Sequence, residues 1–548
     1  MARVKPTDAV AVDQTPGTPD TKEAVSLSDV ESPPSTRDQV PLSYKILSVA
    51  LVAGIGFGSS WSGGVTGAMK STLKKELKIN NIQFALLESS DDFIKTVLIL
   101  ASGMVTDRIG GASAILYGNA IYTIGSILIA AATTIRNYRF MVFGRVVLAF
   151  GDVATQVAQY KIFSSWFPPN NGFASTLGFE LAIGKIGAFV GKSTANIISK
   201  NLGDFSWVFW ISVFMNVFTN LITLTFFFFT KYANKRFTNI TDPSTGEKLT
   251  EKNKKFEVKK VLELPWVFWA VLAFSLLETS TAMVFTQNAT EFAEHRFNTD
   301  SITAGWYTSV LQYAGFFLVP LIGIFVDLFG NRISLMAFCG IGVFIAMALV
   351  NWANTTQGTA AAFGIYAFAY TFGPTVIIDS IRTSMWHQEV FGSAYALKIM
   401  MNNSMNIIVN LITGRIQDAD NDSYDRVVIV YVVLAAGSVV VSIGLVVLST
   451  ISVDLRRLQW TRKQRIMNGP LIVERKERFL GENGPKNRKI KRVTEKQAGK
   501  EVQIARQATN QGRKRLCRTG VEDRKQERLR KKRAKACQKP SGSIPLGD

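Results

Sequence analysis

The chain has 548 residues, of which 47% are apolar and only 19% are charged. Globular domains use about 25% charged residues, so this composition excludes a single water-soluble domain of this length and, equally, a chain that is disordered throughout. The formal net charge is +21, and nearly all of it belongs to residues 451–548. Three scattered cysteines exclude a disulfide framework and a zinc site.

Residues 1–42 are rich in Ser, Thr, Pro and Asp and contain no aromatic residue, which predicts a disordered tail without a cleavable signal. From Tyr44 onward, apolar stretches of membrane-spanning length recur. They are 44–69, 83–105, 112–133, 139–166, 172–198, 205–229, 265–291, 304–326, 333–350, 358–384, 390–414 and 427–450. Because backbone polar groups must be bonded internally in hydrocarbon, each is expected to be an α-helix.

The charged stretch 230–264 divides the predicted spans into two equal halves. The halves repeat at a fixed offset, because Gly103, Asp107 and Gly110 recur as Gly323, Asp327 and Gly330. We therefore predict an all-α membrane protein with two pseudo-symmetric six-helix bundles. The predicted domains are a cytosolic N-tail (1–42), an N-terminal bundle (43–229), a cytosolic linker (230–264), a C-terminal bundle (265–450) and a basic cytosolic C-tail without a fold of its own (451–548).

The distribution of Lys and Arg predicts the topology. The stretch 230–264 and the C-tail are both basic, so the positive-inside rule places them and both termini in the cytosol. Three N-x-Ser/Thr glycosylation sequons fall on the opposite side, at Asn288, Asn354 and Asn421. We expect the tethered tail to lie on the anionic leaflet of the bilayer rather than to bind nucleic acid; docking of a protein partner stays open.

Two short loops carry the most specific motif. One contains Gly103, Asp107, Arg108 and Gly110, and its repeat contains Gly323, Asp327, Gly330 and Arg332. The first glycine of each lets two helices approach closely, the second permits a tight turn, and the aspartate can face a helix N-terminus or a neighbouring arginine. Together with Arg145 in the fourth span, these gating loops resemble the major facilitator superfamily, which implies a secondary transporter that works by alternating access.

Within that superfamily, the first half resembles the branch of lysosomal dipeptide transporters. The resemblance rests on Ile79-Asn80-Asn81, on the run from Val157 to Phe167, and on the segment from Leu177 to Gly187, which contains Lys185. It implies a dipeptide or amino acid as substrate and a lysosomal or vacuolar membrane, with the plasma membrane as the alternative. No nucleotide loop, nucleophile motif or metal-ligand spacing occurs, so neither enzymatic activity nor a cofactor or metal is expected.

Ionisable residues inside the spans are functional candidates, because a charge at mid-membrane costs about 2.5–3.5 kcal/mol on insertion scales. The candidates for substrate binding are Lys185, Asp152, Gln156, Gln159, Glu278, Glu180, Lys398 and Asn402. The candidates for proton coupling or structural ion pairs are Glu88, Asp91, Asp92, Lys95 and Asp379. For Asp92 and Lys95, the simplest structural interpretation is that they form an ion pair with each other.

The leading hypothesis is transport of a small zwitterion. Lys185 would bind its carboxylate, and Asp152 or Glu278 would bind its amine or a proton; the competing role for Lys185 is to neutralise Asp152. Two alternatives stay open: transport of a sugar or organic anion, and a receptor or scaffold that does not transport and acts through its basic tail.

Overall fold

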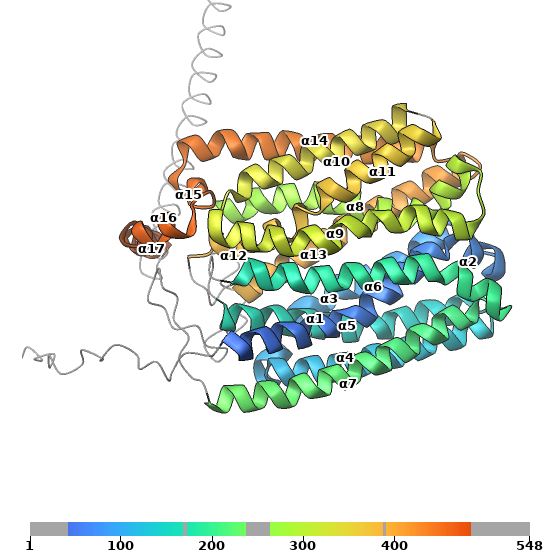
Figure 1. Ribbon diagram of the computed structural model, residues 1–548, viewed down its shortest axis with the longest axis horizontal. Helices are drawn as coiled ribbons and strands as arrows, with labels where there is room; N and C mark the ends of the chain where they lie inside the picture. Colours follow the sequence, from blue (N-terminus) through green and yellow to red (C-terminus); the bar gives the residue numbers. More distant parts are fainter. Residues whose placement is uncertain (1–41, 168–171, 237–263, 354, 387–390, 484–548) are drawn as a thin grey trace, which may run out of the picture.

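The computed structural model describes residues 42–167, 172–236, 264–353, 355–386 and 391–483. The predicted N-tail and most of the predicted linker lie outside these ranges. Within them every regular element is a helix, and the long helices run side by side along the long axis of the molecule (Figure 1).

The N-terminal half contains six long helices and one short one. These are α1 (Leu42–Ala68), α2 (Lys70–Leu77), α3 (Asn81–Ile109), α4 (Gly111–Thr134), α5 (Tyr138–Trp166), α6 (Phe173–Leu202) and α7 (Ser206–Arg236). The short helix α2 and the C-terminal end of α7 lie at opposite ends of the bundle, which we name the α2 end and the linker end (Figure 1).

The C-terminal half repeats the arrangement. Its helices are α8 (Trp266–Phe297), α9 (Ser301–Phe329), α10 (Arg332–Trp352), α11 (Thr356–Tyr370), α12 (Gly373–Ser384), α13 (Phe391–Ala419) and α14 (Asp425–Ile451). The predicted tenth span is not one regular helix, because α11 ends at Tyr370 and α12 starts at Gly373. Pro374 explains this break, since proline has no amide hydrogen to donate to the carbonyl oxygen of Tyr370 one turn earlier.

Ten segments of the described part of the chain are long and apolar enough to cross a membrane, with α11 and α12 counted as one. The two long helices that fail this test, α3 and α13, are the most polar, and they pack against each other between the two halves. A polar helix is tolerated in a membrane where protein rather than lipid surrounds it. With these two included, the prediction of twelve transmembrane helices in two bundles is confirmed.

Small residues bring the halves together at a second seam, between α6 and α9. A Cβ added to Gly178 would lie only 2.7 Å from the carbonyl oxygen of Val319, and one added to Gly323 would overlap the carbonyl oxygen of Ala174. The predicted close approach at Gly323 is therefore confirmed. Gly110 and Gly330 have φ angles of 84° and 71°, so both predicted turns need glycine.

Local sequence fixes the start of α3. The side chain of Asn80 accepts a hydrogen bond from the amide of Gln83, and the side chain of Gln83 accepts one from the amide of Asn80. This capping box satisfies two amides that a helix start leaves unpaired, and it explains the Ile79-Asn80-Asn81 motif before the second span.

The expectation that the C-tail has no fold is wrong for its first part. The structure describes α15 (Val453–Arg456), α16 (Arg462–Met467) and α17 (Gly469–Asn483) at the linker end. Leu455 and Leu458 are buried, and the carbonyl oxygen of Leu458 accepts a hydrogen bond of 3.1 Å from the guanidinium of Arg332. Apolar side chains of this segment are therefore buried against the rest of the protein, and this packing orders the segment despite its positive charge.

Candidate functional site

A cavity of about 520 Å³ lies between the two halves, within the range of roughly 300–1,000 Å³ that is typical of small-molecule sites. Helices of both halves line it. Its charged and amide-bearing lining residues are Glu88, Asp91, Asp92, Lys95, Asn119, Arg145, Asp152, Gln156, Gln159, Glu180, Lys185, Lys192, Gln287 and Gln312.

One wall of the cavity is an ion-pair network between α3 and α5. Lys95 Nζ lies 2.7 Å from a carboxylate oxygen of Asp91 and 2.5 Å from one of Asp152. Gln156 donates a hydrogen bond of 3.0 Å to Asp152. The predicted pairing of Lys95 with Asp92 is therefore wrong in its partner, because Asp91, one helical turn before Lys95, reaches the ammonium instead, and Asp92 hydrogen-bonds Asn406 of α13.

A second pair lies nearer the α2 end. Arg145 donates to Glu88 at 2.7 Å and to the hydroxyl of Thr66 at 2.9 Å, and Gln287 of the opposite half donates to the other oxygen of Glu88 at 3.1 Å. Arg145, which we grouped with the gating loops as part of the same family pattern, lies apart from them, because α5 starts at the α2 end and Arg145 is only two turns inside it. Its side chain lines the cavity, whereas the gating loops lie at the linker end.

The facing wall is formed by α6. Lys185 Nζ lies 4.7 Å from the centre of the Tyr370 ring, and Gly315 of α9 leaves room for its methylene stem. Glu180 accepts hydrogen bonds from Gln159 at 3.2 Å and from the hydroxyl of Tyr160 at 3.5 Å. Among the described residues, neither Lys185 nor Glu180 has an ion-pair partner within 4.0 Å.

Three predicted substrate ligands do not line this cavity. Glu278 is fully buried and accepts hydrogen bonds from Thr279 at 3.0 Å and from the thiol of Cys339 at 3.4 Å. Asn402 is buried against Ser275, to which it donates at 3.0 Å, and Lys398 is also absent from the lining. Glu278 and Asn402 instead contact other residues of the C-terminal half, Cys339 and Ser275 respectively.

At the linker end the gating loop of the C-terminal half behaves as predicted. Asp327 accepts hydrogen bonds from the amide and hydroxyl of Ser175, at 2.8 and 2.5 Å, in the first turn of α6. A carboxylate there satisfies unpaired amides and interacts favourably with the helix dipole. The side chain of its repeat partner, Asp107, lies outside the described part, and Arg108 is exposed.

Arginines of the C-terminal half complete this end. Arg382 donates to the carbonyl oxygen of Phe167 at 2.9 Å and stacks 4.4 Å from the ring centre of Phe173, both in the N-terminal half. Arg332 pairs with Asp379 at 2.5 Å, and both are fully buried. The expectation of an ion pair at Asp379 is thus met, with an arginine of the gating loop as its partner.

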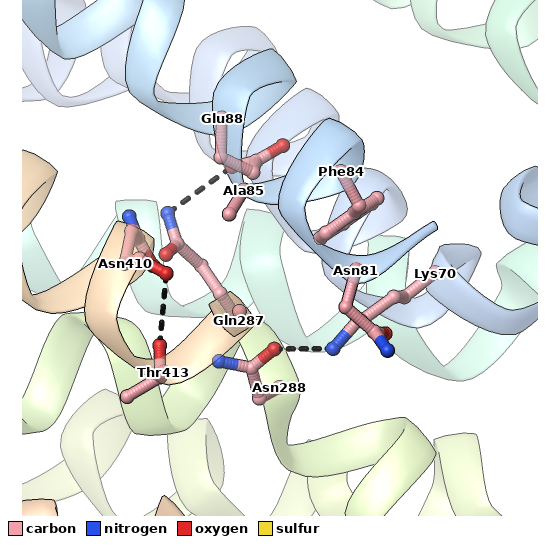
Figure 2. Close-up of a pocket in the computed structure, with 10 residues that line it drawn as sticks. Lys70, Asn81, Phe84, Ala85, Glu88, Gln287, Asn288, Asn410 and Thr413 are labelled. Carbon is pink, nitrogen blue, oxygen red and sulfur yellow. Dashed lines mark hydrogen bonds between the residues drawn. The ribbon is translucent and has the colours of Figure 1, made fainter. Parts of the chain in front are cut away.

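At the α2 end, a cluster of charged residues joins the two halves, and we did not predict it from the sequence. Lys70, which is 2% exposed, lies 2.7 Å from Glu291, and Lys74 lies 2.9 Å from Glu291 and from Asp422. Lys70 also donates to the side-chain oxygen of Asn288 at 2.6 Å (Figure 2). Because α2 belongs to one half and these partners to the other, the cluster closes the cavity at this end.

Outside the spans, the charges of this cluster stabilise each other. Partial burial acts to lower the pKa of Lys74, but Glu291 and Asp422 outweigh it and raise the pKa above its usual value. Burial acts to raise the pKa of Asp422, but hydrogen bonds from Asn81 and Lys74 outweigh it and lower the pKa. Both groups are therefore held in their charged forms.

Of the three predicted glycosylation sites, Asn288 is contradicted. Its side chain is buried and hydrogen-bonded to Lys70 and to the hydroxyl of Tyr431, so no glycan fits there (Figure 2). Asn421 is exposed in the turn between α13 and α14, as a glycan requires, and Asn354 lies outside the described residues.

Comparisons with known proteins agree with this architecture. The family model for the Major Facilitator Superfamily matches residues 49–410. The lysosomal dipeptide transporter MFSD1 of Homo sapiens is 23% identical over 402 residues, which are 70% of this chain and 83% of that protein. Polyol transporter 5 of Arabidopsis thaliana is 34% identical over 89 residues, 16% of each chain.

The fold has a solved counterpart. The proton:xylose symporter XylE, bound to 6-bromo-6-deoxy-D-glucose, superposes with a TM-score of 0.56 at 13% identity, over 74% of this chain and 95% of that one. Two six-helix halves around a polar cavity, the repeated gating loop and a family model that matches most of the chain lead to one assignment. The chain is a multi-pass membrane protein and belongs to the major facilitator superfamily of transporters.

Proposed function

We propose that this protein transports small zwitterions, foremost dipeptides, through the cavity by alternating access. One observation carries the proposal: α6 presents Lys185 and Glu180 to the cavity, and neither has an ion-pair partner within 4.0 Å among the described residues. A buried charge normally needs a compensating partner, and a bound zwitterion supplies both.

The contacts made by the other charged residues of the cavity narrow the roles that the substrate-binding candidates can have. Lys95 is ion-paired with Asp152 as well as with Asp91, so Asp152 already has a charged partner and Lys185 is not that partner. Lys185 is therefore the group for the substrate carboxylate. Glu180 replaces Asp152 and Glu278 as the group for the substrate ammonium, because it faces the cavity and is hydrogen-bonded only by neutral donors.

The spacing of the two groups favours a dipeptide over an amino acid. Glu180 and Lys185 are five residues apart, which is about 7.5 Å along a helix axis. The two side chains also leave the helix about 140° apart, so a ligand that contacts both must be extended, and each residue of a peptide extends at most about 3.6 Å. A dipeptide doubles that reach. The similarity to a lysosomal dipeptide transporter over 83% of its length supports the same substrate class.

We further propose a lysosomal or vacuolar membrane as the location, on the basis of that same similarity. The Lys- and Arg-rich stretches 230–264 and 451–548 favour a cytosolic linker end with both termini on that side. Placement of the basic stretch 484–548 on an anionic leaflet, and movement of protons with the solute, stay predictions.

Uptake by purified protein in lipid vesicles tests the proposal. We expect uptake of an uncharged-side-chain dipeptide such as alanyl-alanine, weaker uptake of alanine and none of glucose. Deletion of residues 484–548 should leave uptake intact if transport is the primary activity. A folded protein that moves neither dipeptides nor amino acids, with or without a pH gradient, would contradict the proposal and favour a receptor or a transporter of another solute.

A further inference from the structure

Lys192 is a second buried lysine on the cavity face of α6, and the proposed function gives it no role. It follows Lys185 by seven residues, which is nearly two full turns, so both side chains project from the same face. The spacing places Lys192 about 10.5 Å nearer the α2 end. Its side chain lines the same cavity although it is only 2% exposed.

The closed structure gives this ammonium a single neutral acceptor. Lys192 Nζ donates a hydrogen bond of 2.7 Å to the backbone carbonyl oxygen of Thr286 in α8. No ion pair of Lys192 is found in the part of the chain that the structure describes. An ammonium carries three donors and a full charge, and a carbonyl oxygen compensates only part of the cost of burying them.

Thr286 belongs to a set of groups that also holds Lys185. The hydroxyl of Thr286 lies 3.1 Å from the hydroxyl of Tyr366, whose ring stacks on Tyr370 at 5.4 Å between centres. Tyr370 in turn lies under Lys185. Lys185 and Lys192, both on α6, are therefore each in contact with a neutral group of the C-terminal half.

This arrangement changes when the cavity opens at the α2 end. Opening separates α6 from α8, because the two helices belong to different halves. The Lys192–Thr286 hydrogen bond is then lost, and the ammonium is left facing the entrance of the cavity. An anionic group that enters from this end meets Lys192 before it meets Lys185.

We propose that Lys192 is a second carboxylate-binding residue, which binds the carboxylate of the substrate at the α2 side of the cavity before Lys185 does. The inference rests on the proposed function and extends it. It divides the path of the carboxylate into two steps on one helix face, an outer step at Lys192 and an inner step at Lys185. A substrate that enters from the linker end reaches Lys185 without first passing Lys192.

The test is Lys192→Gln, measured as the KM for alanyl-alanine from each side of the membrane. Glutamine keeps a donor for the Thr286 carbonyl and removes the charge, so the closed structure is preserved. Vesicles of uniform orientation are selected through an affinity tag fused to the C-terminus. Lys192→Arg tests whether charge alone suffices, and Lys200→Gln, at an exposed lysine on the same helix, is the matched control.

We expect Lys192→Gln to raise the KM from the α2 side about tenfold or more, as loss of a charge-assisted hydrogen bond does, and to change the KM from the linker side less than twofold. Lys192→Arg should restore most of the loss, and Lys200→Gln should match the wild type. Equal KM values for Lys192→Gln and wild type on the α2 side, or equal increases on both sides, overturn the inference alone. Absence of dipeptide uptake by the wild type overturns the proposed function and the inference with it.

Discussion

Glu291 is the residue whose loss should open the cavity at the α2 end. Its carboxylate accepts from Lys70 at 2.7 Å, from Lys74 at 2.9 Å and from the hydroxyl of Tyr424 at 2.5 Å. Glu291→Gln removes the charge and leaves Lys70 buried with neutral partners only. Because the contact joins α2 to α8 across the two halves, its loss destabilises the closed α2 end and not the fold of either half.

The size of this effect follows from the burial of the pair. Side chains of Lys70 and Glu291 are 2% and 4% exposed, and removing one partner of a buried ion pair costs about 3–5 kcal/mol. Each 1.4 kcal/mol is tenfold in an equilibrium constant, so the ratio of closed to open protein should fall by roughly a hundredfold or more. The exposed pair of Arg136 and Glu76 at the same end contributes only about 0–1 kcal/mol.

Labelling of a cysteine in the cavity measures this opening. Ser62→Cys, in a background without the three native cysteines, places a thiol in the cavity wall. A membrane-impermeant thiol reagent added on the α2 side should react far faster in Glu291→Gln. Glu76→Gln is the control and should change the rate less than about fivefold, and Lys70→Met should restore closure in the double variant. An unchanged labelling rate in folded Glu291→Gln would refute the reasoning.

Three further predictions concern separate parts of the molecule. Gly315→Ala places a Cβ 3.1 Å from the Cγ of Lys185, so the lysine must shift, and the KM for dipeptide should rise several-fold with unchanged folded yield. The lowered pKa of Asp422 means that its contact with Lys74 is present above the ordinary pKa and lost only as the pH falls through the lowered value; the raised pKa of Lys74 preserves the contact up to high pH. Asp422→Asn should therefore accelerate cavity labelling by the same factor at pH 5.5 and 7.5, and a factor that vanishes at pH 5.5 would contradict this. Asn421→Gln should remove the glycan at Asn421, which a shift in gel mobility shows. A glycan found on any other described residue of this variant would contradict the topology.

The fold was predictable because the membrane imposes simple rules on the sequence. Apolar length located the spans, and the repeat of Gly323, Asp327 and Gly330 located the two halves. The break after Tyr370 was harder to predict, since Pro374 is tolerated in many transmembrane helices whose neighbours satisfy the freed backbone groups. The helices in the first part of the C-tail were not predicted, because composition alone does not show that Leu455 and Leu458 pack against the C-terminal half.

The site was only partly predictable. Their positions inside apolar spans marked Lys95, Asp152 and Lys185 as candidates, and all three line one cavity, but the sequence did not show which charges pair with one another. Ion pairing between α3 and α5 depends on the rotation of the two helices relative to each other. Residue spacing within one helix does not determine that rotation. The cluster around Lys70 was missed for a related reason, since charges near span ends usually face solvent, and only the docking of the two halves buries them. Lys192 carried a usable signal, its seven-residue spacing from Lys185.

The central claim is that Lys185 binds the carboxylate of a zwitterionic substrate during transport. It is tested most directly by uptake of alanyl-alanine and of its C-terminal amide, which lacks the carboxylate, into vesicles containing the wild type or Lys185→Ala. A charge-assisted hydrogen bond contributes about 1.5–3 kcal/mol, so the wild type should prefer the acid over the amide by roughly ten- to a hundredfold. Lys185→Ala should lose this preference, and Lys185→Arg should retain more of it because it keeps the charge. Equal uptake of acid and amide by the wild type, or an undiminished preference in a well-folded Lys185→Ala, would contradict the claim.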